Sequence, residues 1–167
     1  MSVKQEPTTA IARRSDNYIE PWRGVEWQRL WLSLQSRPWT AMAVIPASSG
    51  APPGFTMTIA MTLARTGMIH LASPIHVADG TDLALGSVVA FLDEIARCKA
   101  AGERILIALA PMADNPVSET LAQSADCTLL CVLFENMASA EAKRTVSKLG
   151  KDRFIGATIF RADGSPS

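Results

Sequence analysis

Short runs in which nearly every residue is apolar recur along the chain from about residue 39. A run of this kind is typical of a strand that is buried on both faces of a parallel sheet. Gly, Pro, Ser, Asn or Asp residues stand in many of the segments between the runs, as expected for turns. The predicted strands are Thr40–Pro46, Met68–Ala72, Arg104–Ala110, Thr128–Phe134 and Phe154–Phe160.

Between these runs, apolar residues return every three or four positions, which indicates helices with one buried face. The clearest stripe lies between Leu85 and Ala96, and Gly102 is predicted to end that helix. The other helices are predicted over residues 56–65, 116–124 and 138–149, the first of them stopped by Gly67. Strands that alternate with such helices predict an α/β fold, a doubly wound, mostly parallel sheet flanked by helices.

The four tryptophans lie before residue 40, ahead of most of the predicted sheet. Trp27, Leu30, Trp31 and Leu34 are spaced to share one face of a helix. Two interpretations remain open for this face: it packs on the domain's own core, or it binds a partner, because Trp anchors interfaces well. The candidate partner-binding residues are Trp22, Trp27, Arg29 and Trp31.

The organisation expected of the chain is one domain with short polar ends. Residues 1–21 are mostly polar and are predicted to be a flexible leader, residues 22–161 the domain, and residues 162–167 a tail. The three cysteines have no paired spacing, and Cys127 and Cys131 lie in an apolar run, so we expect buried free thiols rather than disulfides.

Charge narrows the classes of function. Lys plus Arg and Asp plus Glu number 16 each, so the net charge is zero, which excludes a strongly basic nucleic-acid binder. No stretch approaches the ~18 consecutive apolar residues of a membrane span. Residues 1–9 lack the apolar core of a signal peptide, and we therefore expect a cytoplasmic protein.

The loop over residues 47–56 is the default ligand site, because ligands of parallel sheets bind beyond the carboxyl ends of the strands. It resembles a phosphate loop, but only three residues separate Gly50 from Gly54, and Phe55 follows where the lysine of a P-loop would stand. Pro52 and Pro53 also remove two N–H donors. The candidate residues of this degenerate nucleotide loop are Ser48, Ser49, Gly50, Gly54, Phe55 and Thr56.

Two other groupings favour no special chemistry. His70, His76, Asp79 and Asp82 include metal-ligating types, but their spacing fits no strong metal template, and no metal is expected. The serines of the loop lack the G-x-S-x-G elbow of a nucleophile.

Several segments, taken in order, resemble those of a known family. Glu26, Arg29 and Trp31 follow its E-x-x-R-x-L pattern, with Trp31 at the leucine position. Further segments similar to its motifs are AVIPASSGAPPGFTMTIAMTLA (43–64), MIHLAS (68–73), GTDLALG (80–86), LIALAP (106–111), LAQSADCTLLCV (121–132) and IGATIF (155–160). The family is the bacterial tyrosine kinases of capsular and exopolysaccharide biosynthesis, of the MinD/ParA-type P-loop class. The resemblance covers residues 24–161 and implies a P-loop NTPase-like, three-layer fold.

The departures from that family imply a protein without catalysis. MgATP chemistry needs a lysine on the phosphates and carboxylates for the metal. The loop offers Phe55 or Thr56, Ala72 and Ala108 stand at the two acidic positions that follow strands in the family, and the single tyrosine is Tyr18. ATP and magnesium are therefore not expected as cofactors.

The resemblance implies a regulator or scaffold in exopolysaccharide biosynthesis or export. Its partner would be a membrane polysaccharide co-polymerase or a second copy of the chain, and the protein would be recruited to the inner membrane. Two alternatives stay open: a residual nucleotide-binding ATPase of MinD/ParA type, and a plain α/β interaction module in positioning or secretion.

Overall fold

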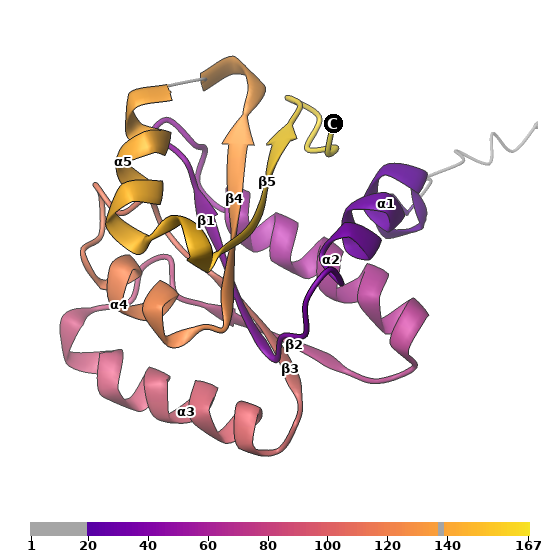
Figure 1. Ribbon diagram of the computed structural model, residues 1–167, viewed down its shortest axis with the longest axis horizontal. Helices are drawn as coiled ribbons and strands as arrows, with labels where there is room; N and C mark the ends of the chain where they lie inside the picture. Colours follow the sequence, from indigo (N-terminus) through magenta and orange to yellow (C-terminus); the bar gives the residue numbers. More distant parts are fainter. Residues whose placement is uncertain (1–19, 137–138) are drawn as a thin grey trace, which may run out of the picture.

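A parallel sheet forms the middle layer of the structure (Figure 1). The structure is a computed structural model that describes residues 20–136 and 139–167. Within these residues the sheet has five strands in the order β2-β3-β1-β4-β5, and every pairing is parallel. The strands are β1 (Ala41–Pro46), β2 (Ile75–Asp79), β3 (Arg104–Ala108), β4 (Cys127–Leu133) and β5 (Phe154–Phe160). The predicted doubly wound, parallel α/β fold is confirmed.

Helices cover both faces of this sheet (Figure 1). The α-helices are α1 (Val25–Ser33), α2 (Phe55–Leu71), α3 (Val88–Ala100), α4 (Val117–Ser124) and α5 (Ser139–Leu149). Short 3₁₀ helices are η1 (Pro21–Arg23), η2 (Leu85–Ser87), η3 (Phe134–Asn136) and η4 (Lys151–Arg153). Residues of α1 and α2 share one core cluster with the sheet, whereas α3, α4 and α5 share the other.

The central strand explains why the core forms on both sides. Every residue of β1 is buried, and its side chains alternate between the two faces. Met42 and Val44 pack with α1 and α2, while Ala43 and Ile45 pack with the helices of the opposite face. A continuous apolar run without alternation is the sequence signature of such a strand.

The predicted strand Met68–Ala72 is wrong. Helix α2 continues to Leu71, and the strand lies at Ile75–Asp79. Gly67 does not end the helix: it lies within it, where an added Cβ would stand 2.4 Å from Trp31 and from Ile75. Ala72 follows the helix with a φ of 50° and donates its N–H to the carbonyl of Met68, so it caps α2 and does not end a strand.

Helix α1 packs its tryptophan face on the chain's own core. Trp27 and Trp31 are 4% and 1% exposed. The Trp27 ring lies 5.8 Å from that of Phe160, and Trp31 meets Trp39 edge-on at 5.9 Å. The structure therefore favours packing of this face on the domain's own core over binding of a partner. The prediction that Trp27 and Trp31 bind a partner is wrong because both rings are buried within this chain.

The other two candidates on this side of the molecule are more accessible. Arg29 is exposed on α1. Trp22 is partly exposed, with the guanidinium of Arg65 stacked 4.4 Å from the centre of its ring. These two residues remain available to a partner.

Cys127 and Cys131 are buried and free, as expected. Burial raises the pKa of the Cys127 thiol to about 11 and also raises the pKa of Cys131. Both thiols stay protonated at neutral pH and are poor nucleophiles and metal ligands.

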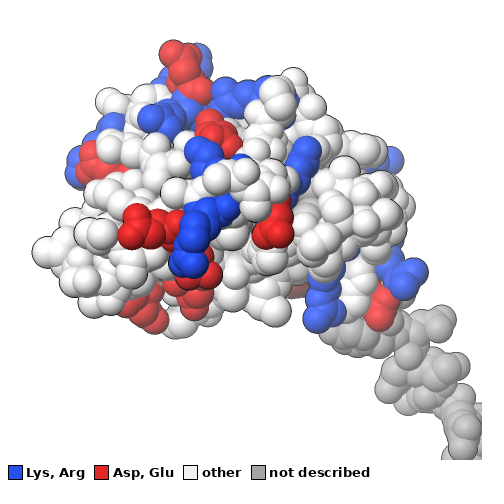
Figure 2. All heavy atoms as spheres, turned by 90° about the horizontal axis from the view of Figure 1, so that it is seen from below, with Lys and Arg blue, Asp and Glu red and all other residues white. Residues whose placement is uncertain are grey.

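The charged surface is mixed. Figure 2 shows Lys and Arg side chains interspersed with Asp and Glu on the face seen from below the view of Figure 1. Neither sign forms a continuous patch on this face. In the described part of the chain, none of the helices is long and apolar enough to cross a membrane.

Asp126 ties the start of β1 to α3, and this gives a prediction for acid stability. Its carboxylate accepts hydrogen bonds from the N–H groups of Thr40 (2.8 Å) and Ala41 (2.9 Å) and lies 2.7 Å from Lys99 Nζ. Burial alone would raise the pKa of this carboxyl, but these bonds outweigh it and hold the pKa below its usual value.

A depressed pKa stabilises the fold above the unfolded-state pKa of about 3.9, and this stabilisation is lost as pH falls through the lower folded-state value. We expect Asp126→Asn to lower the free energy of unfolding by about 1 kcal/mol at pH 7. The difference in the free energy of unfolding between the variant and the wild type should become smaller below about pH 4. Urea denaturation at several pH values measures this difference. A difference that does not change with pH would contradict the stabilising role of the Asp126 carboxylate.

Candidate functional site

The carboxyl ends of β1 and β3 form the point at which the chain turns to opposite faces of the sheet. The two strands are neighbours, yet α2 follows β1 on one face and α4 follows β3 on the other. Loops that diverge in this way leave a crevice, the usual ligand site of open parallel sheets. Two pockets border the loop over residues 47–54 here, and Pro111 lines both of them.

The loop leads directly from β1 into helix α2. The N–H of Ala47 still pairs with the carbonyl of Cys131 at 2.8 Å, so the loop begins at the sheet. The N–H of Phe55 donates to the carbonyl of Pro52, and Gly54 has a φ of 77°, a conformation that favours glycine. Gly54 is thus the residue that lets the chain turn into α2.

Thr56 is held by the end of β3. Its hydroxyl donates to the carbonyl of Leu109 at 2.7 Å, and the residue is 3% exposed. The hydroxyl proton is therefore used inside the protein, and Thr56 serves to fix the start of α2 to the sheet.

The larger pocket, of about 460 Å³, lies on the α2 side of the loop. We call it the switch-point pocket. Its charged lining residues are Asp82 and Asp114, and none of the residues that line it is Lys or Arg. Phe55 forms part of the wall where a P-loop would place its lysine. Two carboxylates without a cation disfavour a phosphate group by like-charge repulsion.

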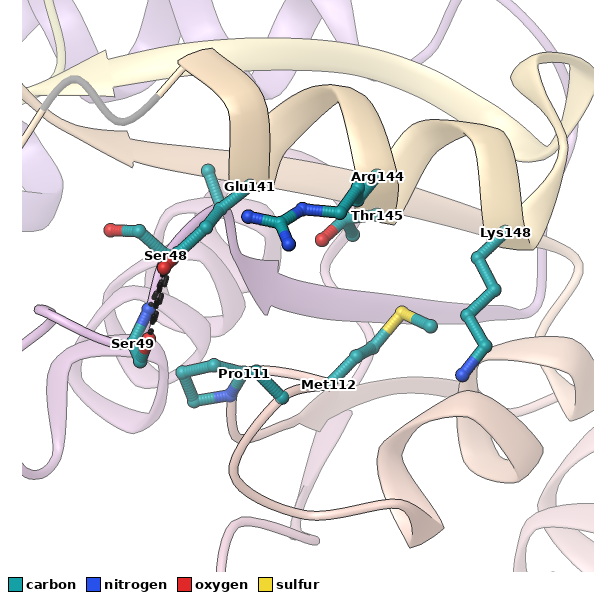
Figure 3. A pocket seen from close by; sticks show the side chains of 10 residues that line it. Ser48, Ser49, Pro111, Met112, Glu141, Arg144, Thr145 and Lys148 are labelled. Carbon is teal, nitrogen blue, oxygen red and sulfur yellow. Dashed lines mark hydrogen bonds between the residues drawn. The ribbon is translucent and has the colours of Figure 1, made fainter.

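The second pocket, of about 230 Å³, lies between the loop, the segment after β3 and helix α5 (Figure 3). We call it the α5 pocket. Its polar lining residues are Ser48, Ser49, Glu141, Arg144, Thr145 and Lys148, and Met112 forms part of its apolar wall.

A carboxylate of the chain itself is bound at the loop in this pocket. Glu141 accepts hydrogen bonds from the N–H of Ser49 at 3.0 Å and from its hydroxyl at 3.3 Å (Figure 3). The groups that a phosphate loop offers to its ligand are the backbone N–H groups. At Ser49 that donor is used by an anionic side chain from 92 positions further along the chain.

The predicted loop residues are divided between the two pockets. Ser48 and Ser49 line the α5 pocket, whereas Gly54, Phe55 and Thr56 line the switch-point pocket. Gly50 is exposed in the turn between them.

Ala108 and Ala72 were predicted to stand where the family has acids, and the structure agrees with the strand-end position of the first but not of the second. Ala108 ends β3, fully buried and paired with Val44 and Asp79. The prediction that Ala72 replaces an acid at the end of the second strand is wrong, because that strand ends at Asp79. The Asp79 carboxylate accepts bonds from the N–H of Thr81 at 3.0 Å and from its hydroxyl at 2.6 Å, so it shapes the following turn.

Sequence reasoning missed the residues that α5 contributes. Glu141, Arg144, Thr145 and Lys148 recur at i, i+3, i+4 and i+7, which places them on one face of a helix. This spacing could have indicated a shared polar face. A polar helix face is usually exposed to solvent, however, so the sequence analysis predicted only the buried apolar face of this helix.

No family model, no curated protein and no solved structure matches this chain. Within residues 20–136 and 139–167, no three His, Cys, Asp or Glu side chains gather in a group that could hold a metal ion. The resemblance to the exopolysaccharide tyrosine kinases accordingly stays a prediction.

Proposed function

We propose that this protein is a non-catalytic, P-loop-like regulator or scaffold that acts by binding other molecules. The observation that carries the proposal is the internal use of the loop's polar groups. Glu141 is bound by the N–H and hydroxyl of Ser49, and the hydroxyl of Thr56 donates to Leu109. A loop engaged in this way offers few donors to the phosphates of a nucleotide.

The charges at the crevice support the same proposal. Phosphoryl transfer depends on cations that neutralise the developing charge and on a metal held by carboxylates. The switch-point pocket has Asp82 and Asp114 but no cation among its lining residues. The carboxylate of Asp79, at the end of β2, is bonded to Thr81.

The pathway part of the proposal rests on the resemblance of residues 24–161. On that basis we propose a role in exopolysaccharide biosynthesis or export, in the cytoplasm at the inner membrane, with a membrane co-polymerase or a second copy as partner. Arg29 and the partly exposed Trp22 replace the buried tryptophans as the candidate contact residues.

One observation favours the alternative of a residual nucleotide-binding protein. Asp79 lies at the carboxyl end of β2, a position from which a carboxylate can approach a ligand at the crevice. In that case magnesium would bind together with a nucleotide and displace Thr81 from the carboxylate.

The two proposals differ in their response to MgATP. We expect the melting temperature of the full chain to be the same with MgATP as with ATP plus a chelator, because the lining residues of the switch-point pocket include Asp82 and Asp114 but no cation to bind the phosphates. A ligand present at a hundred times its Kd would stabilise the protein by about 2.7 kcal/mol, which a thermal melt detects readily. A magnesium-dependent rise in melting temperature would support the alternative and contradict the proposed function.

A further inference from the structure

Helix α5 presents a polar face to the α5 pocket. Glu141, Arg144, Thr145 and Lys148 all line it (Figure 3). The opposite side of the helix, with Ala142, Val146 and Leu149, packs on the sheet. The helix is therefore anchored by its apolar side, and its polar face is held against the loop.

The pocket already binds one anion. The Glu141 carboxylate is held by two donors of Ser49, its N–H at 3.0 Å and its hydroxyl at 3.3 Å. A backbone N–H next to a hydroxyl is a common arrangement for binding oxyanions. Glu141 thus occupies the donors that an external anion would use.

A second hydroxyl lines the same pocket, that of Thr145 on α5. Thr145 is 8% exposed as a residue and lines the pocket. In Figure 3 its hydroxyl points into the pocket. A hydroxyl that faces the pocket can donate to the acceptor oxygens of a ligand.

Arg144 supplies a positive charge that no carboxylate neutralises within the described residues. Lys148 is paired with Glu119 at 2.9 Å, whereas the Arg144 side chain makes only a long hydrogen bond, 3.4 Å, to the carbonyl of Ala140. Its guanidinium extends over the pocket in Figure 3. A guanidinium matches the geometry of phosphate oxygens and binds them through two parallel hydrogen bonds.

We propose that the α5 pocket binds a small phosphate or phosphate monoester, with Glu141 as the internal competitor that the ligand displaces from Ser49. Arg144 binds the anion, Ser49 and Thr145 donate to its oxygens, and Pro111 and Met112 contact the organic part of a monoester. This inference goes beyond the proposed function, because it makes the loop after β1 responsive to a metabolite without magnesium.

A titration with sodium phosphate at constant pH and ionic strength tests this site. The readout is the amide chemical shifts of Ser49 and Thr145 in the full chain. Glu141→Gln keeps an acceptor for Ser49 but removes the competing charge, and we expect it to tighten phosphate binding about fivefold or more. We expect Arg144→Gln to weaken binding about tenfold or more, since it removes a charged hydrogen-bond donor.

Arg97→Gln on α3 is the matched control, because Arg97 is also an exposed arginine of a helix and lies outside the pocket. It should bind phosphate as the wild type does. The inference is overturned if the two amides do not shift in Glu141→Gln at millimolar phosphate, or if Arg144→Gln binds as tightly as the wild type. Magnesium-dependent ATP binding would contradict the proposed function but would leave this magnesium-free result unaffected.

Discussion

Trp31→Ala is expected to lower the free energy of unfolding by about 3–5 kcal/mol, the range for removing a buried tryptophan from a core. The Trp31 ring is 1% exposed and fills the space between α1, α2 and Trp39. Its loss removes these contacts and leaves a cavity in the core. Urea denaturation followed by circular dichroism measures the change.

Leu32→Ala is the matched control for this substitution. Leu32 is the next residue of α1 but is 61% exposed, so its truncation should change the free energy of unfolding by less than about 0.5 kcal/mol. Equal stability of Trp31→Ala and the wild type would contradict the packing of α1. In that case the tryptophan face of α1 would again be a candidate partner-binding surface.

Gly67→Ala should also destabilise the protein, by about 1–3 kcal/mol, although alanine favours helices over glycine by about 1 kcal/mol. The added Cβ would stand 2.4 Å from Trp31 Cη2 and from Ile75 Cδ1. Both neighbours are buried, so neither ring nor methyl can move away freely. The midpoint of thermal unfolding gives the direction of the effect.

Gly86→Ala controls for the chemical change itself, because no atom lies within 4 Å of a Cβ at Gly86 and its φ is not positive. The Gly86→Ala variant should have nearly the same free energy of unfolding as the wild type. The double variant Trp31→Ala with Gly67→Ala should lose less than the sum of the two single losses, since the first substitution removes the clash of the second. Strict additivity, or a stabilised Gly67→Ala, would show that the two residues do not share this space.

The sequence pattern predicted the sheet well where strands are buried on both faces. β5 has the predicted bounds, and β1, β3 and β4 differ from them by one or two residues. The failure at Met68–Ala72 has a physical cause: MIHLA is apolar enough for a strand, and Gly67 is a normal helix stop. Only the tertiary contact of Gly67 with Trp31 reveals why a glycine is needed inside the helix.

The site was predicted only in part, because most of its chemistry depends on contacts between distant segments. The position of the loop between β1 and α2 was predicted correctly from the apolar run of the strand and the start of the following helix. That this loop is a ligand site stays a prediction. The bonds of Ser49 with Glu141 and of Thr56 with Leu109 join residues 92 and 53 positions apart. A local sequence pattern cannot reveal bonds between residues so far apart in the chain. Because the second strand was predicted at Met68–Ala72, the position of its acid was placed at Ala72 and not at Asp79.

The proposed function requires that the loop after β1 does not bind a magnesium–nucleotide complex, and calorimetric titration of the full chain with MgADP measures such binding. We predict no heat of binding beyond dilution, and no release of phosphate when MgATP is supplied to the same sample. A saturable, magnesium-dependent binding heat with a Kd in the micromolar range would overturn the proposed non-catalytic role.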